Sequence, residues 1–210
     1  LSTTPEYFNF SVPSIPGTLP TLDLTTPMSV TMTINAIQNM PTEVERITSL
    51  SVSPVVTTMH LKLTAPGLRK ITGAGVKDFV MDFPDMLQFG AGIEGMDYNT
   101  NKLTVNKKFA SDGSLSVALP IVGMRQLPDI KNHKMTVDER VVCNGIFEGV
   151  ANGVTAADLA GMQLTFVYDV PDFQIEDIHG TVDADVVIKP ETVNMGDLPD
   201  LVTDESTSLN

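Results

Sequence analysis

The sequence feature that most constrains the fold of this chain is an alternation of apolar and polar residues that recurs in several separate segments. Residues 28–34 read Met-Ser-Val-Thr-Met-Thr-Ile, so every second side chain is apolar. Successive side chains of an extended strand point to opposite faces, so this pattern predicts a strand with one buried face. The same period of two recurs in residues 59–64, 115–121 and 162–168. Four independent segments therefore predict half-buried strands.

Turn signals near such segments indicate how the strands are connected. Asp112-Gly113 follows one extended segment, and Asn144-Gly145 lies inside another. Both dipeptides tolerate the positive φ angles of tight hairpin turns. We therefore expect neighbouring strands to be mostly antiparallel.

Helical signals are few and short. Thr155 could cap one or two helical turns, with Asp158 in the first turn. Pro41 begins a segment that is expected to form a turn or a short helix. Strands joined by hairpins, without alternating long helices, favour a sandwich or barrel over a parallel α/β sheet. We predict an all-β fold of antiparallel β-sandwich modules with one or two short helical turns.

The length of 210 residues fits one large β domain or two sandwiches, and we favour two modules. The first module, residues 1–125, begins with an extended proline-rich arm that is expected to be an edge strand or a linker. The second module covers residues 126–210 and could be truncated at its C-terminal end. Residues 44–54 and 175–185 share a short opening pattern, which duplication or chance would explain. The prolines of the arm are Pro13, Pro16 and Pro20.

Charge and cysteine content limit the expected partners and the compartment. The formal net charge is −13 and the 13 Lys and Arg residues are scattered, so we expect no nucleic acid partner. No stretch approaches the roughly 18 apolar residues of a membrane-spanning helix, so we predict no transmembrane segment in this chain. The chain starts at Leu1, which is compatible with processing and export. The single cysteine, Cys143, cannot form an internal disulfide, so export is expected to be bacterial.

No catalytic residue, cofactor or metal site is predicted. The chain lacks the Gly-x-Ser-x-Gly turn of many hydrolases and the glycine-rich phosphate loops of nucleotide-binding proteins. Cys143 lies among apolar residues and is predicted to be a core residue. Asp183 and Asp185 share one face of an extended run, but an ordinary exposed acidic face explains them more simply than paired catalysis. The histidines lack the spacing of metal ligands and are His60, His133 and His179.

One polar segment, residues 97–101, is the best candidate for contact with a ligand. Its oxygen-bearing side chains alternate as at the start of a calcium loop, but Lys102 stands where that loop requires glycine and Lys108 where it requires glutamate. A polar hairpin turn is therefore the prediction, with Tyr98 as its exposed aromatic residue. The candidate ligand-binding residues are Asp97, Tyr98, Asn99 and Asn101.

Three segments resemble uncharacterised surface lipoproteins of gut Bacteroidetes, some of which are described as cell-adhesion proteins. The segments are residues 75–87, residues 129–137 and, above all, Val-Val-Ile-Lys-Pro-Glu-Thr-Val-Asn-Met-Gly-Asp-Leu-Pro-Asp-Leu-Val-Thr-Asp-Glu at 186–205. The resemblance covers about half of the chain and contains no catalytic motif. It implies a β-sandwich, export to the bacterial periplasm or outer surface, and a lipid anchor upstream of Leu1.

These observations lead to two functional hypotheses. The first is a non-enzymatic, extracytoplasmic surface or cell-adhesion-type protein, whose partner would be a protein or glycan at the cell surface. The alternative is a glycan-binding or glycan-processing accessory protein, motivated by the many carboxylates. A groove lined by Tyr98 or another aromatic residue with converging acids would favour the alternative. The absence of catalytic motifs favours the first hypothesis, although a fold-level analogy is a weak argument for function.

Overall fold

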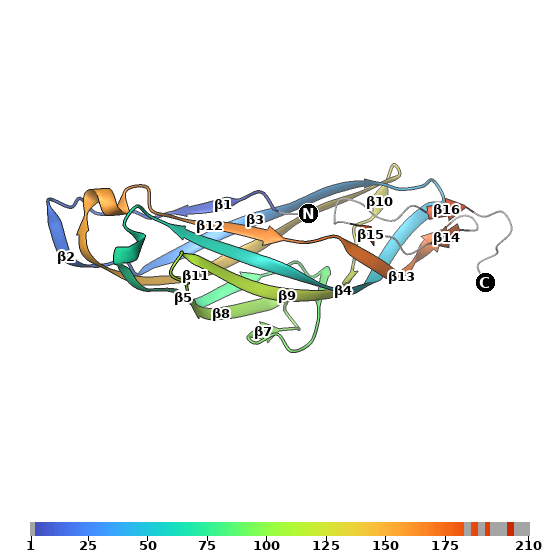
Figure 1. Cartoon of the computed structure of the whole chain (residues 1–210). Helices are drawn as coiled ribbons and strands as arrows, with labels where there is room; N and C mark the ends of the chain where they lie inside the picture. Colours follow the sequence, from blue (N-terminus) through green and yellow to red (C-terminus); the bar gives the residue numbers. More distant parts are fainter. Residues whose placement is uncertain (1–2, 183–185, 189–191, 194–200, 204–210) are drawn as a thin grey trace.

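The computed structural model describes residues 3–182, 186–188, 192–193 and 201–203. Most of them form an elongated sandwich of long strands (Figure 1), and residues 186–188 and 201–203 pair with each other in a separate two-stranded sheet. Two 3-10 helices, η1 (Leu68–Lys70) and η2 (Ala156–Leu159), lie between strands. The strands are β1 (Glu6–Asn9), β2 (Thr18–Asp23), β3 (Thr26–Asn39), β4 (Val44–Thr64), β5 (Ile71–Asp82), β6 (Leu87–Phe89), β7 (Met96–Asp97), β8 (Lys102–Lys108), β9 (Ser114–Arg125), β10 (Ile130–Lys131), β11 (Lys134–Thr155), β12 (Gln163–Asp169), β13 (Phe173–Val182), β14 (Val186–Ile188), β15 (Thr192–Val193) and β16 (Leu201–Thr203).

The first sheet is organised around β4, a strand of 21 residues. On one side β4 pairs with β12 and β13, and on the other side it pairs with β9. Strand β1 continues the sheet beyond β12, β15 continues it beyond β13, and β6 pairs with β9. Every pairing is antiparallel, so the predicted antiparallel arrangement is confirmed for this sheet.

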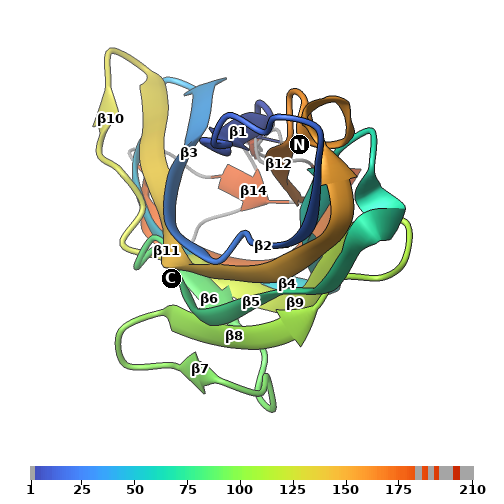
Figure 2. The same ribbon diagram turned by 90° about the vertical axis from the view of Figure 1, so that its left-hand side faces the viewer.

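The second sheet is organised around β11, a strand of 22 residues. It pairs with β3 and β2 along one edge and with β5 along the other, and β8 and β7 follow beyond β5. The short strand β10 forms a hairpin with the start of β11. In the view along the long axis, β1 and β3 lie near each other on the side of the sandwich away from β8 (Figure 2).

The core lies between the two sheets and includes the apolar residues predicted from the alternation. Met32 of β3 and Leu61 of β4 are almost completely buried, whereas their polar neighbours along each strand are more exposed. Aromatic rings from the two sheets meet in the core. The ring centroids of Phe79 on β5 and Phe166 on β12 are 6.0 Å apart. The predicted all-β sandwich is therefore confirmed.

The expected division into two modules, residues 1–125 and 126–210, needs correction. Strand β11 of the expected second module lies between β3 and β5 of the expected first module. Strands β12 and β13 likewise pair with β4. All described strands except β14 and β16, which pair only with each other, thus belong to one sandwich. Strands β4 and β11 are long enough to offer both edges to strands from distant parts of the chain. Within it, Ile175 pairs opposite Val52, so the two segments with a similar opening pattern are antiparallel neighbours.

The glycine dipeptides behave differently from the prediction. Asp112-Gly113 forms a turn, but this turn carries the chain from β8 in the second sheet to β9 in the first, and therefore joins no hairpin. Asn144-Gly145 forms no turn and lies within β11. Gly145 is required there for another reason: a Cβ atom on it would lie 2.6 Å from the Cα atom of Phe79 on β5. This glycine permits close packing of two strands.

Other local predictions are confirmed. Thr155 and Asp158 form a capping box at the start of η2, in which the Asp158 carboxylate accepts a hydrogen bond from the Thr155 N–H (2.8 Å). Pro41 begins a turn, and its carbonyl accepts a hydrogen bond from the N–H of Val44. Pro20 of the proline-rich arm lies in the edge strand β2.

Candidate functional site

The predicted polar turn, residues 97–101, is confirmed as the connection between β7 and β8. The Asp97 carboxylate accepts a hydrogen bond from the backbone N–H of Asn99 (2.9 Å). This bond and one from the Thr100 side chain lower the pKa of Asp97. Asp97 and Asn99 therefore stabilise the turn itself, as residues in such turns commonly do.

Asn101 lies in a different environment from the exposed position expected of a ligand-binding residue. It is 4% exposed and has a positive φ of 53°. Its side-chain amide donates hydrogen bonds to the carbonyl oxygens of Pro84 (3.0 Å) and Leu87 (2.7 Å). Asn101 therefore connects the start of β8 to residues 84–87, which lead into β6, and its role is structural.

Tyr98 is exposed, as predicted, but its hydroxyl group is engaged. The hydroxyl donates a hydrogen bond to the carbonyl of Gly90 (2.8 Å) and accepts one from the N–H of Ile93 (3.0 Å). Both partners belong to the loop of residues 90–95. Tyr98 thus holds this loop in place, and the four candidate residues do not converge on one ligand site.

The loop that Tyr98 holds forms one wall of a cleft of about 610 Å³ between the two sheets. The other walls are residues 103–107 of β8 and Val117, Ala118 and Pro120 of β9. The N–H of Gly90 donates to the carbonyl of Pro120 (2.8 Å), and the N–H of Thr104 donates to the carbonyl of Gly95 (3.0 Å). The loop therefore bridges from the edge of one sheet to the edge of the other.

The cleft is lined mainly by small and apolar side chains and by backbone groups, with few charges. Glu94 and Lys107 are the titratable residues in its lining, and no aromatic ring lines it. Tyr98 contacts the loop without lining the cleft. Sequence reasoning missed the cleft, although the run Gly90-Ala-Gly-Ile-Glu-Gly95, with three glycines in six residues, was a visible signal for an unusual loop.

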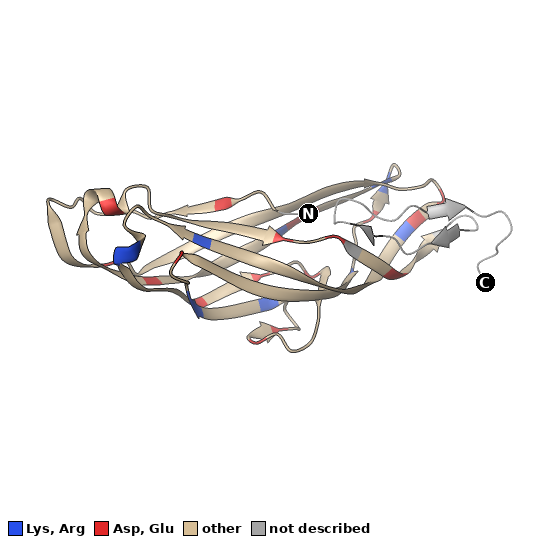
Figure 3. Cartoon of the chain, in the orientation of Figure 1, with Lys and Arg blue, Asp and Glu red and all other residues tan. Residues whose placement is uncertain are grey.

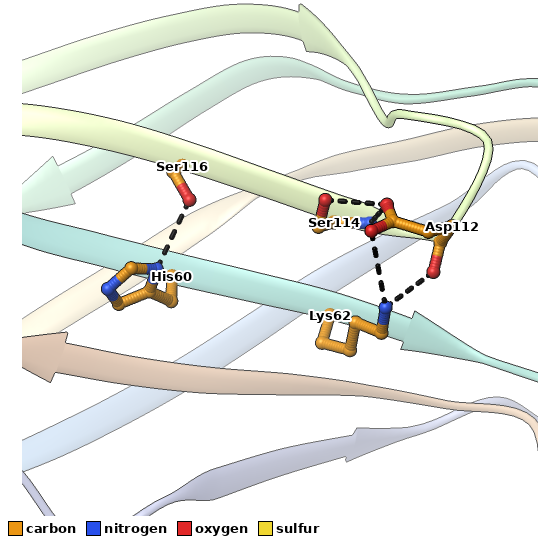
Figure 4. A network of polar contacts seen from close by, with 5 residues as sticks. All are labelled: His60, Lys62, Asp112, Ser114 and Ser116. Atoms are coloured by element: carbon orange, nitrogen blue, oxygen red, sulfur yellow. Dashed lines mark hydrogen bonds and ion pairs between the residues drawn. The ribbon is translucent and has the colours of Figure 1, made fainter.

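A serine–histidine contact on the outer face of the first sheet has a partial resemblance to a catalytic pair. The Nδ1 atom of His60 lies 3.1 Å from the Oγ atom of Ser116 (Figure 4). A hydrolase also needs an acid or carbonyl that orients the histidine, and among the described residues none bonds its other ring nitrogen. The pair lies on the exposed face of the first sheet and has no third catalytic group among the described residues, so we interpret it as an ordinary cross-strand contact.

The neighbouring contacts in Figure 4 are also structural. Asp112 accepts hydrogen bonds from the N–H (2.9 Å) and the hydroxyl (2.6 Å) of Ser114, which lower its pKa. Lys62 donates to the Asp112 carbonyl and lies 3.9 Å from its carboxylate. These contacts hold the turn between β8 and β9.

Two buried groups that could react, the Cys143 thiol and the Tyr168 hydroxyl, are not suited to catalysis. Burial raises the pKa of the Cys143 thiol to about 12, so the thiol stays protonated and is the core residue that was predicted. Burial also raises the pKa of Tyr168, whose hydroxyl lies 2.7 Å from the Oγ atom of Thr57. In the described part of the chain, no three His, Cys, Asp or Glu residues are placed to hold a metal ion. Asp183 and Asp185 lie outside the described residues.

Charged side chains are distributed along the strands and turns, with acidic and basic residues intermixed in the view of Figure 3. Neither helix in the described residues is long and apolar enough to cross a membrane.

Comparison of the chain with protein-family models, with curated proteins and with solved structures finds no match in any of the three.

Proposed function

We propose that this protein is a non-enzymatic, extracytoplasmic surface protein of the cell-adhesion type that binds a partner through the cleft between its sheets. The observation that carries the proposal is the composition of the cleft walls: strand edges, a glycine-rich loop and two titratable residues of opposite sign, Glu94 and Lys107. Such walls offer hydrogen-bonding groups to a partner. General acid–base catalysis would instead need a base placed within hydrogen-bonding distance of the proton that it abstracts.

The location at the bacterial outer surface or in the periplasm is supported by the resemblance of residues 75–87, 129–137 and 186–205 to surface lipoproteins. The single buried Cys143 agrees with a protein that does not depend on disulfides for stability. The glycan-binding alternative has less support, because the cleft contains one acid and no aromatic platform.

A binding array of glycans and extracellular-matrix proteins, probed with the full chain, tests the proposal. We expect retention of at least one cell-surface component, and loss of it when Ala118 is replaced by tryptophan, which would fill the cleft. The matched control is Thr31→Trp on the exposed edge of β3, which should bind like the wild type. Turnover of a glycan or peptide substrate that is abolished by a single carboxylate substitution would refute the non-enzymatic function.

A further inference from the structure

The cleft contains backbone hydrogen-bonding groups of β9 that no described residue uses. The carbonyl of Ser114 accepts a bond from Ala110, and the carbonyl of Pro120 accepts one from Gly90, so both point away from β4. Backbone groups of a strand alternate in direction with a period of two, so those of Ser116 and Ala118 point the same way. Among the described residues, no strand pairs with this edge of β9 before Ile121.

Strand β8 presents a matching edge on the opposite wall. The N–H of Thr104 donates to Gly95, on the side away from β5, so by the same alternation the backbone groups of Asn106 also point away from β5. The described pairing of β7 with β8 ends at Leu103, which leaves this edge open. Asn106 and Ala118 both line the cleft. Unpaired edges of two sheets therefore face one space.

The two open edges differ in charge. Strand β8 carries three lysines, two of which form ion pairs: Lys102 with Asp82 (3.3 Å) and Lys108 with Glu148 (3.1 Å). Strand β9 carries no charged residue between Ser114 and Met124. Charged residues, lysine above all, protect free edges against pairing with other chains. The edge of β9 lacks this protection, which suits a strand that receives a partner.

The two charged residues of the cleft lining, Glu94 and Lys107, lie at opposite ends of the cleft. Glu94 lies next to Gly95, at the end of the cleft where Thr104 and Pro120 are fixed. Lys107 lines the other end and has no ion-pair partner among the described residues. A strand rises roughly 3.3 Å per residue, so Thr104 and Lys107 are roughly 10 Å apart along β8. Three to four residues of an extended peptide cover this distance.

We propose that the cleft binds an extended peptide segment of a partner protein as an additional strand, antiparallel to β9. This inference rests on the proposed surface-binding function and names the class of partner. Strand addition obtains affinity from main-chain hydrogen bonds and specificity from alternate side chains. Since β9 runs from the Lys107 end to the Glu94 end, the bound segment carries a basic side chain first and an acidic side chain about four residues later.

Two peptides of identical composition, each with a fluorophore at its N-terminus and an amidated C-terminus, test the polarity. The first reads Thr-Lys-Val-Thr-Val-Glu-Thr, and the second has its lysine and glutamate exchanged. Fluorescence anisotropy with the full chain should show saturable binding of the first peptide, with at least a fivefold lower Kd than for the second. Absence of saturable binding up to about 1 mM, or equal affinity for the two peptides, would overturn the inference.

The main-chain contact is tested by Ala118→Pro. This substitution removes an N–H that points into the cleft and that β4 does not use, and Pro120 shows that the same edge accommodates proline. We expect at least a tenfold increase in the Kd of the first peptide with an unchanged urea midpoint. The control is Asn9→Pro at the open edge of β1, which should leave binding unchanged. If Ala118→Pro folds and binds normally, the strand-addition geometry is wrong.

A charge exchange keeps the test informative if the proline variant is unstable. The double variant Glu94→Lys with Lys107→Glu should prefer the second peptide by the factor with which the wild type prefers the first. Unchanged preference would contradict the assigned orientation.

Sedimentation of the wild type should show a monomer, since a dimer abolished by Ala118→Pro would make a second copy of this chain the occupant of the cleft. Failure of peptide binding alone leaves the array result intact, so the two proposals fail separately.

Discussion

Asp112-Gly113 and Asn144-Gly145 are dipeptides of the same kind, and the structure uses them in opposite ways. At the first, the Asp112 side chain bonds Ser114 and Gly113 has a φ of 83°, so both residues build the turn between the two sheets. At the second, Asn144 lies in β11 between paired residues of β3 and β5, and only the glycine is constrained, by the close approach of Phe79.

The comparison shows that the glycine of such a dipeptide marks a position where a Cβ atom does not fit. A turn is one cause of this exclusion, and a closely packed neighbouring strand is the other. In a turn the exclusion comes from the backbone angle, and the residue before the glycine contributes hydrogen bonds. In a strand it comes from a neighbouring element, and the residue before the glycine is free to vary. Substitutions at the four positions separate these causes.

The largest effect is expected for Gly113→Ala. The positive φ disfavours alanine, and its Cβ atom would also collide with the carbonyl oxygen of Leu63. The two penalties together should lower the free energy of unfolding by about 3 kcal/mol, measured by urea denaturation. A loss below about 1 kcal/mol would mean that the turn relaxes without a cost and would contradict this account.

A smaller loss is expected for Gly145→Ala, which adds only the packing conflict. The new Cβ atom would lie 2.6 Å from the Cα atom of Phe79, so β5 has to shift away from β11. We expect about 2 kcal/mol of destabilisation in the same experiment. If the substitution is neutral, the close approach of the two strands is not constrained by this glycine.

Replacing Asp112 by asparagine should lower the melting temperature by about 2 °C or less at pH 7, because the residue is exposed. The hydrogen bonds from Ser114 lower the folded-state pKa of Asp112 below its unfolded value. Their contribution is therefore complete above the unfolded pKa and is lost as the pH falls through the folded pKa.

The difference in melting temperature between wild type and Asp112→Asn should accordingly be constant near neutrality and shrink as the pH falls below about 4. Thermal scans from pH 7 to about 2.5 measure it. A difference that grew on acidification would show that the carboxylate is destabilising in the folded state. Thr64→Val, at an exposed hydrogen bond to the backbone carbonyl of Gln163, is a suitable comparison variant because this bond contains no titrating group.

The smallest effect is expected for Asn144→Thr. The Asn144 side chain is exposed, and its backbone is part of a continuous strand, where threonine is favoured over asparagine. The free energy of unfolding should change by less than about 0.5 kcal/mol. A loss as large as that of Gly145→Ala would indicate that Asn144 does contribute a turn-like contact.

Much of the fold follows from residues 28–34, 59–64, 115–121 and 162–168, because a period of two determines which side chains are buried. The pairing partners do not follow from it. Nothing in the alternation of β4 indicates that it pairs with β13, more than 100 residues later, since each strand offers the same hydrogen-bonding groups along its edges. The expected boundary at residue 125 was wrong for this reason.

The candidate site was less accessible to sequence reasoning. The pattern of residues 97–101 predicted the polar turn, but Asn101 is buried by carbonyl partners at Pro84 and Leu87 that sequence spacing does not reveal. The cleft depends on the positions of the edges of β8 and β9 relative to each other, and these positions are determined by the packing of the two sheets. The three glycines from Gly90 to Gly95 were its one local signal.

The pairing of β1 with β12 brings Glu6 opposite Phe166, a residue far away in the sequence. This distance along the chain has a consequence for the speed of folding. Contacts between residues so distant in sequence require closure of a very long loop, and folding rates fall as such contacts come to dominate a structure. During synthesis, the first sheet cannot be completed until its last strands, β12, β13 and β15, have left the ribosome. Until then the uncharged edge of β9 has no finished sandwich behind it, so the nascent chain is expected to depend on holding factors to avoid aggregation.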